Sequence, residues 1–165
     1  MYTDQRGDIQ TSYREWLEPV KWDVFATLRF THANVKPEEA AAHFHEMHNR
    51  MERDRRTSIG YACALERRAR DTDGLVAYHI HAVFAGLHRP VSPQLVAGMW
   101  GEKLAKAGPY DPRKDGLPYI FKEATDPDCW AEVYDRIDKF IPGSLRPMRP
   151  RDVRRWASAG TRRTA

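Results

Sequence analysis

Hydrophobic residues recur along this chain with two different periods, and each period predicts one type of element. Three runs rich in β-branched and aromatic residues predict strands at about 22–31, 59–68 and 75–86. Apolar residues at helical spacing predict helices at about 37–54 and 93–106. Strands and helices in this order do not alternate strictly, as they do around a parallel sheet. We therefore expect an α+β fold with an antiparallel sheet that helices cover on one face.

The patterns after residue 106 are shorter. Residues 108–111 predict a short strand, and residues 115–124 favour a short helix. A last helix is predicted to open at Pro127, because apolar residues then recur every three or four positions. These positions are Trp130, Val133, Ile137 and Phe140. Pro142-Gly143 is expected to end the packed part of the chain.

Length and composition predict one domain with a tail. The chain has 165 residues, of which 41% are hydrophobic, which suffices for one core. We expect a lead-in over residues 1–20, a domain over 21–142 and an arginine-rich tail over 143–165. No apolar run approaches the ~20 residues of a membrane-spanning helix, and the N-terminus lacks a signal-peptide pattern. With Cys63 and Cys129 interpreted as reduced thiols, the chain is expected to be cytoplasmic and without membrane partners.

A candidate metal site lies in the strand predicted at 75–86, which contains His79-Ile80-His81. Side chains of a strand alternate between faces, so His79 and His81 project to the same side, about 7 Å apart along the backbone. A hairpin turn around 71–73 would bring Glu66 opposite the His79 region. Two imidazoles and a carboxylate suit Mg²⁺ or Mn²⁺. The alternative is two polar histidines on the wet face of a half-exposed sheet.

A candidate nucleophile, Tyr119, lies three residues before Lys122 in a stretch where Asp115 is a candidate helix N-cap. A phenol is a poor nucleophile at neutral pH unless a cation stabilises its phenolate form, and Lys122 on the same helix face would do so. An ordinary amphipathic helix with an interfacial tyrosine and a solvated lysine would show the same pattern. Tyr110 and Tyr134 are competing tyrosines, but neither has a lysine three residues later.

The strand-borne His-x-His followed by a helical Tyr-x-x-Lys resembles the HUH endonucleases, specifically the single-tyrosine initiators of rolling-circle replication (Rep proteins). The first motif of this family, an apolar strand just before the first helix, has a counterpart in residues 24–30. The three motifs follow in family order over residues 23–123. The resemblance implies an RRM-like antiparallel sheet with the metal site on its open face and helices mainly on the other. The helix at 37–54 should then lie behind the sheet, opposite the site.

Residue by residue, the resemblance implies that His79, His81 and Glu66 hold a divalent metal, Mg²⁺ or Mn²⁺. It implies that Tyr119 is the nucleophile and Lys122 its helper, and that the product is a 5′-phosphotyrosine with a free 3′-hydroxyl. No second tyrosine follows Tyr119 at four-residue spacing, unlike the two-tyrosine phage-type initiators. The implied partner is single-stranded DNA at a replication origin or element end. The free 3′ end would prime a host polymerase. A helicase would come from the host or from a separate chain, because no phosphate-binding loop occurs in these residues.

The net positive charge of the chain comes from its C-terminal tail. Residues 141–165 hold seven arginines (146, 149, 151, 154, 155, 162 and 163) and a single acid, Asp152, in a chain whose net charge is +4. A basic arm neutralises phosphates and makes binding salt-dependent, and a tryptophan offers a surface on which bases stack. We therefore predict a DNA-binding role for Arg146, Arg149, Arg151, Arg154, Arg155 and Trp156. The alternative is a tail that only increases solubility.

Three other functions fit the same residues. An HUH transposase or a plasmid-mobilisation relaxase would use the same chemistry on other DNA ends. A non-catalytic RRM-like module would bind nucleic acid through its sheet and tail, with His79 and His81 as ordinary surface residues. A metal-dependent phosphodiesterase acting on small nucleotides would cleave without a covalent adduct and would not need the tail.

Overall fold

The computed structural model describes residues 5–32, 35–69, 76–87, 92–123, 126 and 128–143. The elements follow one another in this order: α1 (Gln5–Leu17), β1 (Trp22–Arg29), α2 (Pro37–Arg55), β2 (Gly60–Ala69), β3 (Val76–Ala85), α3 (Ser92–Trp100), β4 (Ala105–Pro109), α4 (Gly116–Ile120) and β5 (Ala131–Val133). Single 3₁₀ turns occur at η1 (Pro112–Lys114), η2 (Phe121–Glu123) and η3 (Ile137–Phe140). In the ranges described, no helix has the length and apolar character needed to span a bilayer.

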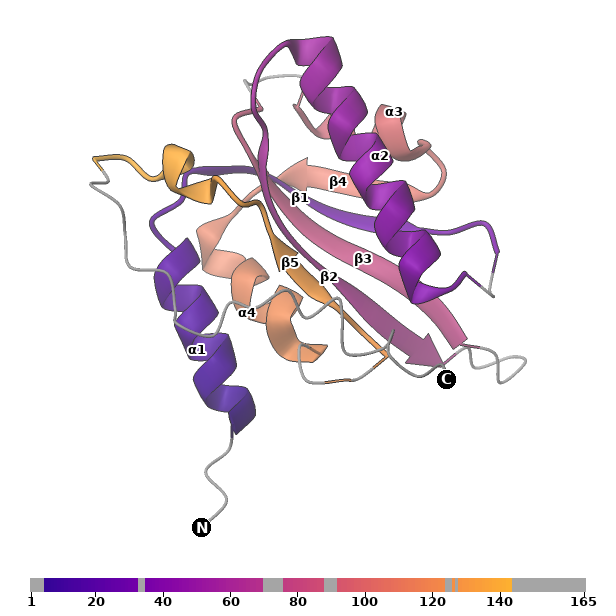
Figure 1. Ribbon diagram of the computed structural model, residues 1–165, viewed down its shortest axis with the longest axis horizontal. Helices are drawn as coiled ribbons and strands as arrows, with labels where there is room; N and C mark the ends of the chain where they lie inside the picture. Colours follow the sequence, from indigo (N-terminus) through magenta and orange to yellow (C-terminus); the bar gives the residue numbers. More distant parts are fainter. Residues whose placement is uncertain are drawn as a thin grey trace, which may run out of the picture.

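The strands form one five-stranded antiparallel sheet in the order β4-β1-β3-β2-β5 (Figure 1). β1, β3 and β2 therefore lie in the interior of the sheet, and the two shorter strands β4 and β5 form its edges. This arrangement confirms the predicted α+β class and the predicted antiparallel sheet.

The β2–β3 hairpin has the register that the sequence predicts. Glu66 pairs with His79 across this ladder. On the other side of β3, Arg29 pairs with His79 and Thr27 pairs with His81. Because paired residues of antiparallel strands share a face, these side chains are placed on one side of the sheet.

Helices α2 and α3 cover the opposite face. In α2, the buried residues Ala40, Phe44, Met47 and Met51 recur at helical spacing and pack on the alternate residues of the central strands. The core residues on β1 are Val24, Ala26 and Leu28, and those on β3 are Ile80, Ala82 and Phe84. Helix α2 therefore lies behind the sheet, opposite His81, as expected.

The expectation that helices cover mainly one face is wrong, because α1 and α4 pack against part of the second face (Figure 1). Trp16 and Leu17 of α1 are buried there with Leu117 and Ile120 of α4. The Tyr13 ring stacks on that of Phe121, with centroids 4.3 Å apart. Helix α1, which lies in the segment predicted to be a lead-in, thus packs against the α4–η2 segment that carries Tyr119 and Lys122.

Two predicted helices need correction. The helix predicted at 93–106 ends at Trp100, and Ala105 already begins β4. The helix predicted from Pro127 is instead strand β5 followed by the turn η3. Its helical spacing is misleading because Trp130 packs into the core under α2, whereas Ile137 packs into the core under α1. Pairing with β2 satisfies backbone groups that a helix here would leave unpaired at the sheet edge.

Candidate active site

Three neighbouring strands and one short helical segment converge on the face of the sheet opposite α2. β1 contributes Thr27, β2 contributes Glu66 and β3 contributes His81, all from positions that alternate with core residues. The α4–η2 segment lies against β2 and β3 on this face and brings Tyr119 and Lys122 to them. Residues distant in sequence thus meet at one point on the sheet.

Glu66 is the centre of this cluster. Its Oε1 accepts a hydrogen bond from the Lys122 ammonium, with the two atoms 2.6 Å apart. Its Oε2 is hydrogen-bonded to Nε2 of His81. Glu66 and His81 are both buried, and Lys122 is half-buried. A buried carboxylate is retained only when it is paired, and here both of its oxygens have partners.

Tyr119 contacts the same cluster from the solvent side. The Lys122 ammonium lies 3.9 Å from the centre of its ring, and the rings of Tyr119 and His81 meet nearly perpendicular with centroids 4.9 Å apart. The Tyr119 side chain is 42% exposed, so a macromolecular substrate can reach it. The structure therefore places an accessible phenol next to a fixed ammonium, as the Tyr-x-x-Lys spacing predicts.

Thr27 is a member of the cluster that the sequence analysis did not identify. Its hydroxyl lies 3.2 Å from Nδ1 of His81, on the side of the ring away from Glu66. A hydroxyl both donates and accepts, so Thr27 is able to pair with either neutral tautomer of His81. The signal available in the sequence is its alternation with Ala26 and Leu28 on a predicted strand. Its partner could not be identified without the β1–β3 register.

The electrostatics of the cluster favour an ionised carboxylate beside a neutral imidazole. Burial raises the pKa of Glu66, but the hydrogen bonds from Lys122 and His81 outweigh burial and hold that pKa below its ordinary value. Burial lowers the pKa of His81, and its interaction with Glu66 only partly offsets this. Burial also lowers the pKa of Lys122, but its interactions with Glu66 and Tyr119 more than compensate, so Lys122 remains an ammonium.

His79 lies on the same face, between Glu66 and Arg29 in the ladders. Burial, followed by the charges of His81 and Arg29, lowers the pKa of His79, so its imidazole is neutral and able to act as a ligand. In the described part of the chain, no three His, Cys, Asp or Glu side chains form a ready-made metal site. The strand register thus brings three possible metal ligands, His79, His81 and Glu66, to one face of the sheet. In the structure the Glu66 carboxylate is paired with His81 and Lys122.

A cavity of about 430 Å³ opens beside Tyr119. Paired strands β1 and β4 line it on one side, and the loop that leads to α4 lines it on the other. Its volume lies within the range typical of small-ligand sites. Tyr110, one of the competing tyrosines, lines this cavity and is not part of the Glu66 cluster. The predicted DNA-binding residues of the tail, from Arg146 to Trp156, lie outside the described residues.

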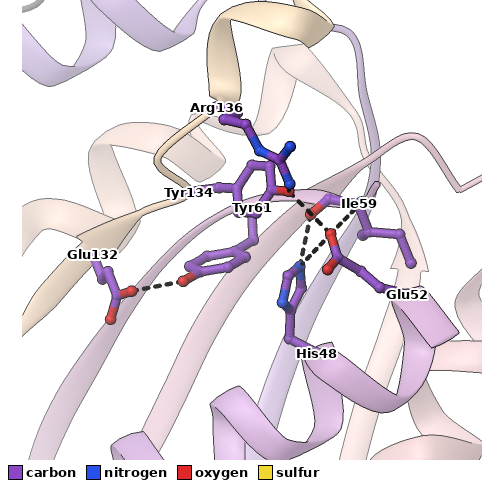
Figure 2. A network of polar contacts seen from close by, with 7 residues as sticks. All are labelled: His48, Glu52, Ile59, Tyr61, Glu132, Tyr134 and Arg136. Carbon is purple, nitrogen blue, oxygen red and sulfur yellow. Dashed lines mark hydrogen bonds and ion pairs between the residues drawn. The ribbon is translucent and has the colours of Figure 1, made fainter. Parts of the chain in front are cut away.

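A second polar network lies on the α2 side of the sheet (Figure 2). The buried His48 donates its Nε2–H to the carbonyl of Ile59 at 2.7 Å, and Tyr61 donates to Glu132 at 2.6 Å. Tyr134 donates its hydroxyl to Glu52 at 3.1 Å. These contacts join α2 to β2 and to the segment after β5. The hydroxyl of Tyr134, the other competing tyrosine, therefore links the segment after β5 to α2 through Glu52.

Comparison of the chain with protein-family models, with curated proteins and with solved structures finds no significant match in any of the three.

Proposed function

We propose that this protein is a metal-dependent DNA endonuclease and strand transferase of the single-tyrosine HUH type, which nicks single-stranded DNA as a replication initiator does. One observation carries the proposal: the accessible Tyr119, its neighbour Lys122 and the strand-borne Glu66 and His81 form one continuous cluster. An exposed tyrosine held against an ammonium and an imidazole, both of which pair with a carboxylate, matches the requirements of a nucleophile and its helpers.

The topology supports the same proposal. From β1 to β4 the elements run strand, helix, strand, strand, helix, strand, and the strands lie in the order β4-β1-β3-β2. This is the connectivity of the ferredoxin-like βαββαβ unit, to which RRM-like domains belong. Domains of that type bind single strands across the sheet face that their helices leave open. In this protein Glu66 and His81 lie on the face opposite α2, which α1 and α4 cover in part.

The reaction that these residues would perform is an in-line phosphoryl transfer. The oxygen of Tyr119 forms a bond to the scissile phosphorus while the bond from phosphorus to the 3′ oxygen breaks. The phenol loses one proton and the leaving 3′ oxygen gains one, which gives a 5′-phosphotyrosine and a free 3′-hydroxyl. The Lys122 ammonium stabilises negative charge that develops on the attacking oxygen.

His79, His81 and Glu66 would hold the metal, Mg²⁺ or Mn²⁺. When bound, such an ion stabilises negative charge on the non-bridging oxygens of the phosphate. Ligation through Nε2 requires His81 to carry its proton on Nδ1, and Thr27 would then accept a hydrogen bond from Nδ1–H. The pairing of Lys122 with Glu66 would keep the carboxylate ionised and correctly oriented.

The chemistry suggests the partners. The phosphotyrosine preserves the energy of the phosphodiester, so the same site would rejoin strands without ATP, and the free 3′-hydroxyl would prime a polymerase. Unwinding of duplex DNA would need a helicase. The arginine-rich tail would add non-specific affinity for the phosphate backbone at low salt.

The test uses a pool of random-sequence single-stranded DNA with Mn²⁺, resolved on a denaturing gel. The wild type is expected to give a protein band shifted by covalently attached DNA, and Tyr119→Phe is expected to give none. Tyr134→Phe serves as the matched control, because Tyr134 lies in the network on the other face, and it should still give the band. Sequencing the attached DNA identifies the nick site.

Other outcomes identify the alternatives. DNA that is bound on a native gel but never attached would indicate a non-catalytic RRM-like module. Cleavage of small nucleotides without any adduct would indicate a phosphodiesterase. An adduct that persists in Tyr119→Phe would move the nucleophile elsewhere. Transposase or relaxase activity would give the same adduct but on the ends of an element or on a transfer origin.

A further inference from the structure

The cavity beside Tyr119 has walls suited to a flat ring. Phe25 of β1 and Tyr110, which follows β4, both line it, and Tyr119 forms a further wall. The two rings of Phe25 and Tyr110 converge on Gly116. A Cβ atom added at Gly116 would lie 3.2 Å from the first ring and 3.3 Å from the second. The aromatic surface is therefore held in place by the backbone at the start of α4.

Gly108 leaves the floor of the cavity open. It pairs with Phe25 across the β1–β4 ladder, so a side chain at this position would project to the same face as the Phe25 ring. A Cβ atom built there meets no heavy atom within 4 Å. The space next to Phe25 is therefore empty because position 108 carries no side chain.

The charged residues around the cavity favour an anion. Lys106, opposite Thr27 in the ladder, and Lys114 of η1 are exposed at its rim. The single carboxylate of the lining, Asp111, is already paired with Arg113, to which both of its oxygens are hydrogen-bonded at 3.0 Å. Two ammonium groups therefore lie at the rim of a cavity whose one lining carboxylate is already paired, although the charges of Glu18 and Asp115 also act on Tyr110. Flat aromatic walls with cations at the rim match a nucleotide, whose base stacks while its phosphates meet lysines.

We propose that this cavity takes up one unstacked base of a single-stranded nucleic acid, next to the phosphate that meets Tyr119. The inference rests on the proposed function for the identity of its ligand, and it adds a base-binding subsite to the reaction centre. Phe25 and Tyr110 stack on the base, and Lys106 and Lys114 bind the neighbouring phosphates. The base in the cavity fixes which phosphate is presented to Tyr119, so this subsite sets the register of cleavage.

The test fills the cavity without replacing any residue of the catalytic cluster. Gly108→Leu introduces a side chain into the open space, and Gly108→Ala introduces a smaller one. Gly98→Leu in α3 is the matched control, because a Cβ atom there also meets nothing within 4 Å and position 98 does not line the cavity. Thermal unfolding of each variant establishes that it is folded.

The probe is random-sequence single-stranded DNA that contains 5-iododeoxyuridine, irradiated in the presence of EDTA so that cleavage does not contribute. In the wild type we expect photocrosslinks to Phe25 or Tyr110, mapped by mass spectrometry. Loss of one base-stacking contact typically weakens binding by about tenfold or more, so Gly108→Leu should reduce these crosslinks by about tenfold. Gly108→Ala should give a smaller reduction, and Gly98→Leu should give none.

Crosslinks that map elsewhere, or that remain at the wild-type level in a folded Gly108→Leu protein, would overturn the subsite. The covalent adduct through Tyr119 is measured separately with Mn²⁺. An adduct without cavity crosslinks would support the endonuclease function and contradict the base-binding subsite. Cavity crosslinks without an adduct would contradict the endonuclease function and support a base-binding site.

Discussion

The ammonium nitrogen of Lys122 lies 3.9 Å from the centre of the Tyr119 ring. The two residues are three positions apart across the junction of α4 and η2, so the helical path places them on one side of the segment. The carboxylate of Glu66 binds the same ammonium at 2.6 Å. The Lys122 ammonium is therefore held by Glu66 of β2 next to the exposed tyrosine, so it is already positioned before a substrate binds.

Removal of the Lys122 charge should slow the reaction more than it weakens DNA binding. Lys122→Met retains most of the side-chain volume but loses the cation, and loss of one such electrostatic contact typically costs about 100-fold in rate or more. We expect the rate of adduct formation to fall by that order, measured in single-turnover assays with saturating DNA. Lys122→Arg, which restores a positive charge, should recover part of the rate. A wild-type rate for Lys122→Met would exclude Lys122 as the helper.

The hydroxyl of Thr27 should matter for metal affinity rather than for folding. Thr27→Val is nearly isosteric but cannot pair with Nδ1 of His81, so the ring loses the partner that orients it. Loss of such a partner typically costs about 10–100-fold in metal affinity. We expect the Mn²⁺ concentration for half-maximal adduct formation to rise by this factor. Thr27→Ser should restore it, whereas an unchanged requirement in Thr27→Val would remove Thr27 from the site.

The proposed metal ligands should respond to metal in the absence of DNA. A ligand that binds only the folded state at about 100 times its Kd stabilises that state by about 2.7 kcal/mol. Mn²⁺ should therefore raise the Tm of the wild type but not that of His81→Ala, which should still bind DNA and lose metal-dependent cleavage. His79→Ala and Glu66→Gln should behave alike, and the exposed His43→Ala is the control. Full cleavage by His81→Ala would contradict the metal assignment.

The pH dependence of stability should depend in part on His48. Burial lowers the pKa of His48, and the nearby Glu52 and Glu132 raise it only in part. The unfolded chain therefore takes up a proton on this residue at higher pH than the folded protein does. Below about pH 6.5, the ordinary histidine pKa, this residue costs stability as the pH falls, by at most about 1.4 kcal/mol per pH unit.

His48→Gln retains a donor for the Ile59 carbonyl but does not titrate. Its free energy of unfolding, from urea titrations between pH 5 and pH 7, should decrease less with falling pH than that of the wild type. The exposed His43→Gln should follow the wild type. Parallel curves for His48→Gln and the wild type would show that His48 does not contribute.

The residue pattern correctly predicted the β2–β3 hairpin and the apolar face of α2, whereas the place of α2 behind the sheet was implied by the family resemblance. In the hairpin, an alternating pattern and a turn-forming tip specify the pairing, so Glu66 was placed opposite His79 without a structure. In α2, one apolar stripe is sufficient to choose the face that packs on the sheet. Both predictions depend on local sequence only.

The segment after Pro127 was predicted wrongly for a reason that is not local. Its helical spacing arises from residues that enter two different cores, Trp130 on one side of the sheet and Ile137 on the other. The unpaired edge of β2 decides the conformation, because its backbone groups gain partners when β5 forms. No pattern within residues 127–140 contains this information.

By itself, the sequence determined the α+β class, the shared face of His79, His81 and Glu66, and the pairing of Tyr119 with Lys122 along one turn. These follow from strand alternation, hairpin register and helical spacing, each of which acts over a few residues. Only the tertiary structure decided that Lys122 meets Glu66, that Thr27 pairs with His81, and that Gly108 leaves a cavity beside Tyr119. These contacts join elements far apart in the chain. Strand pairing sets the Thr27–His81 contact and the place of Gly108, and the packing of α1 and α4 on the sheet places Lys122 next to Glu66.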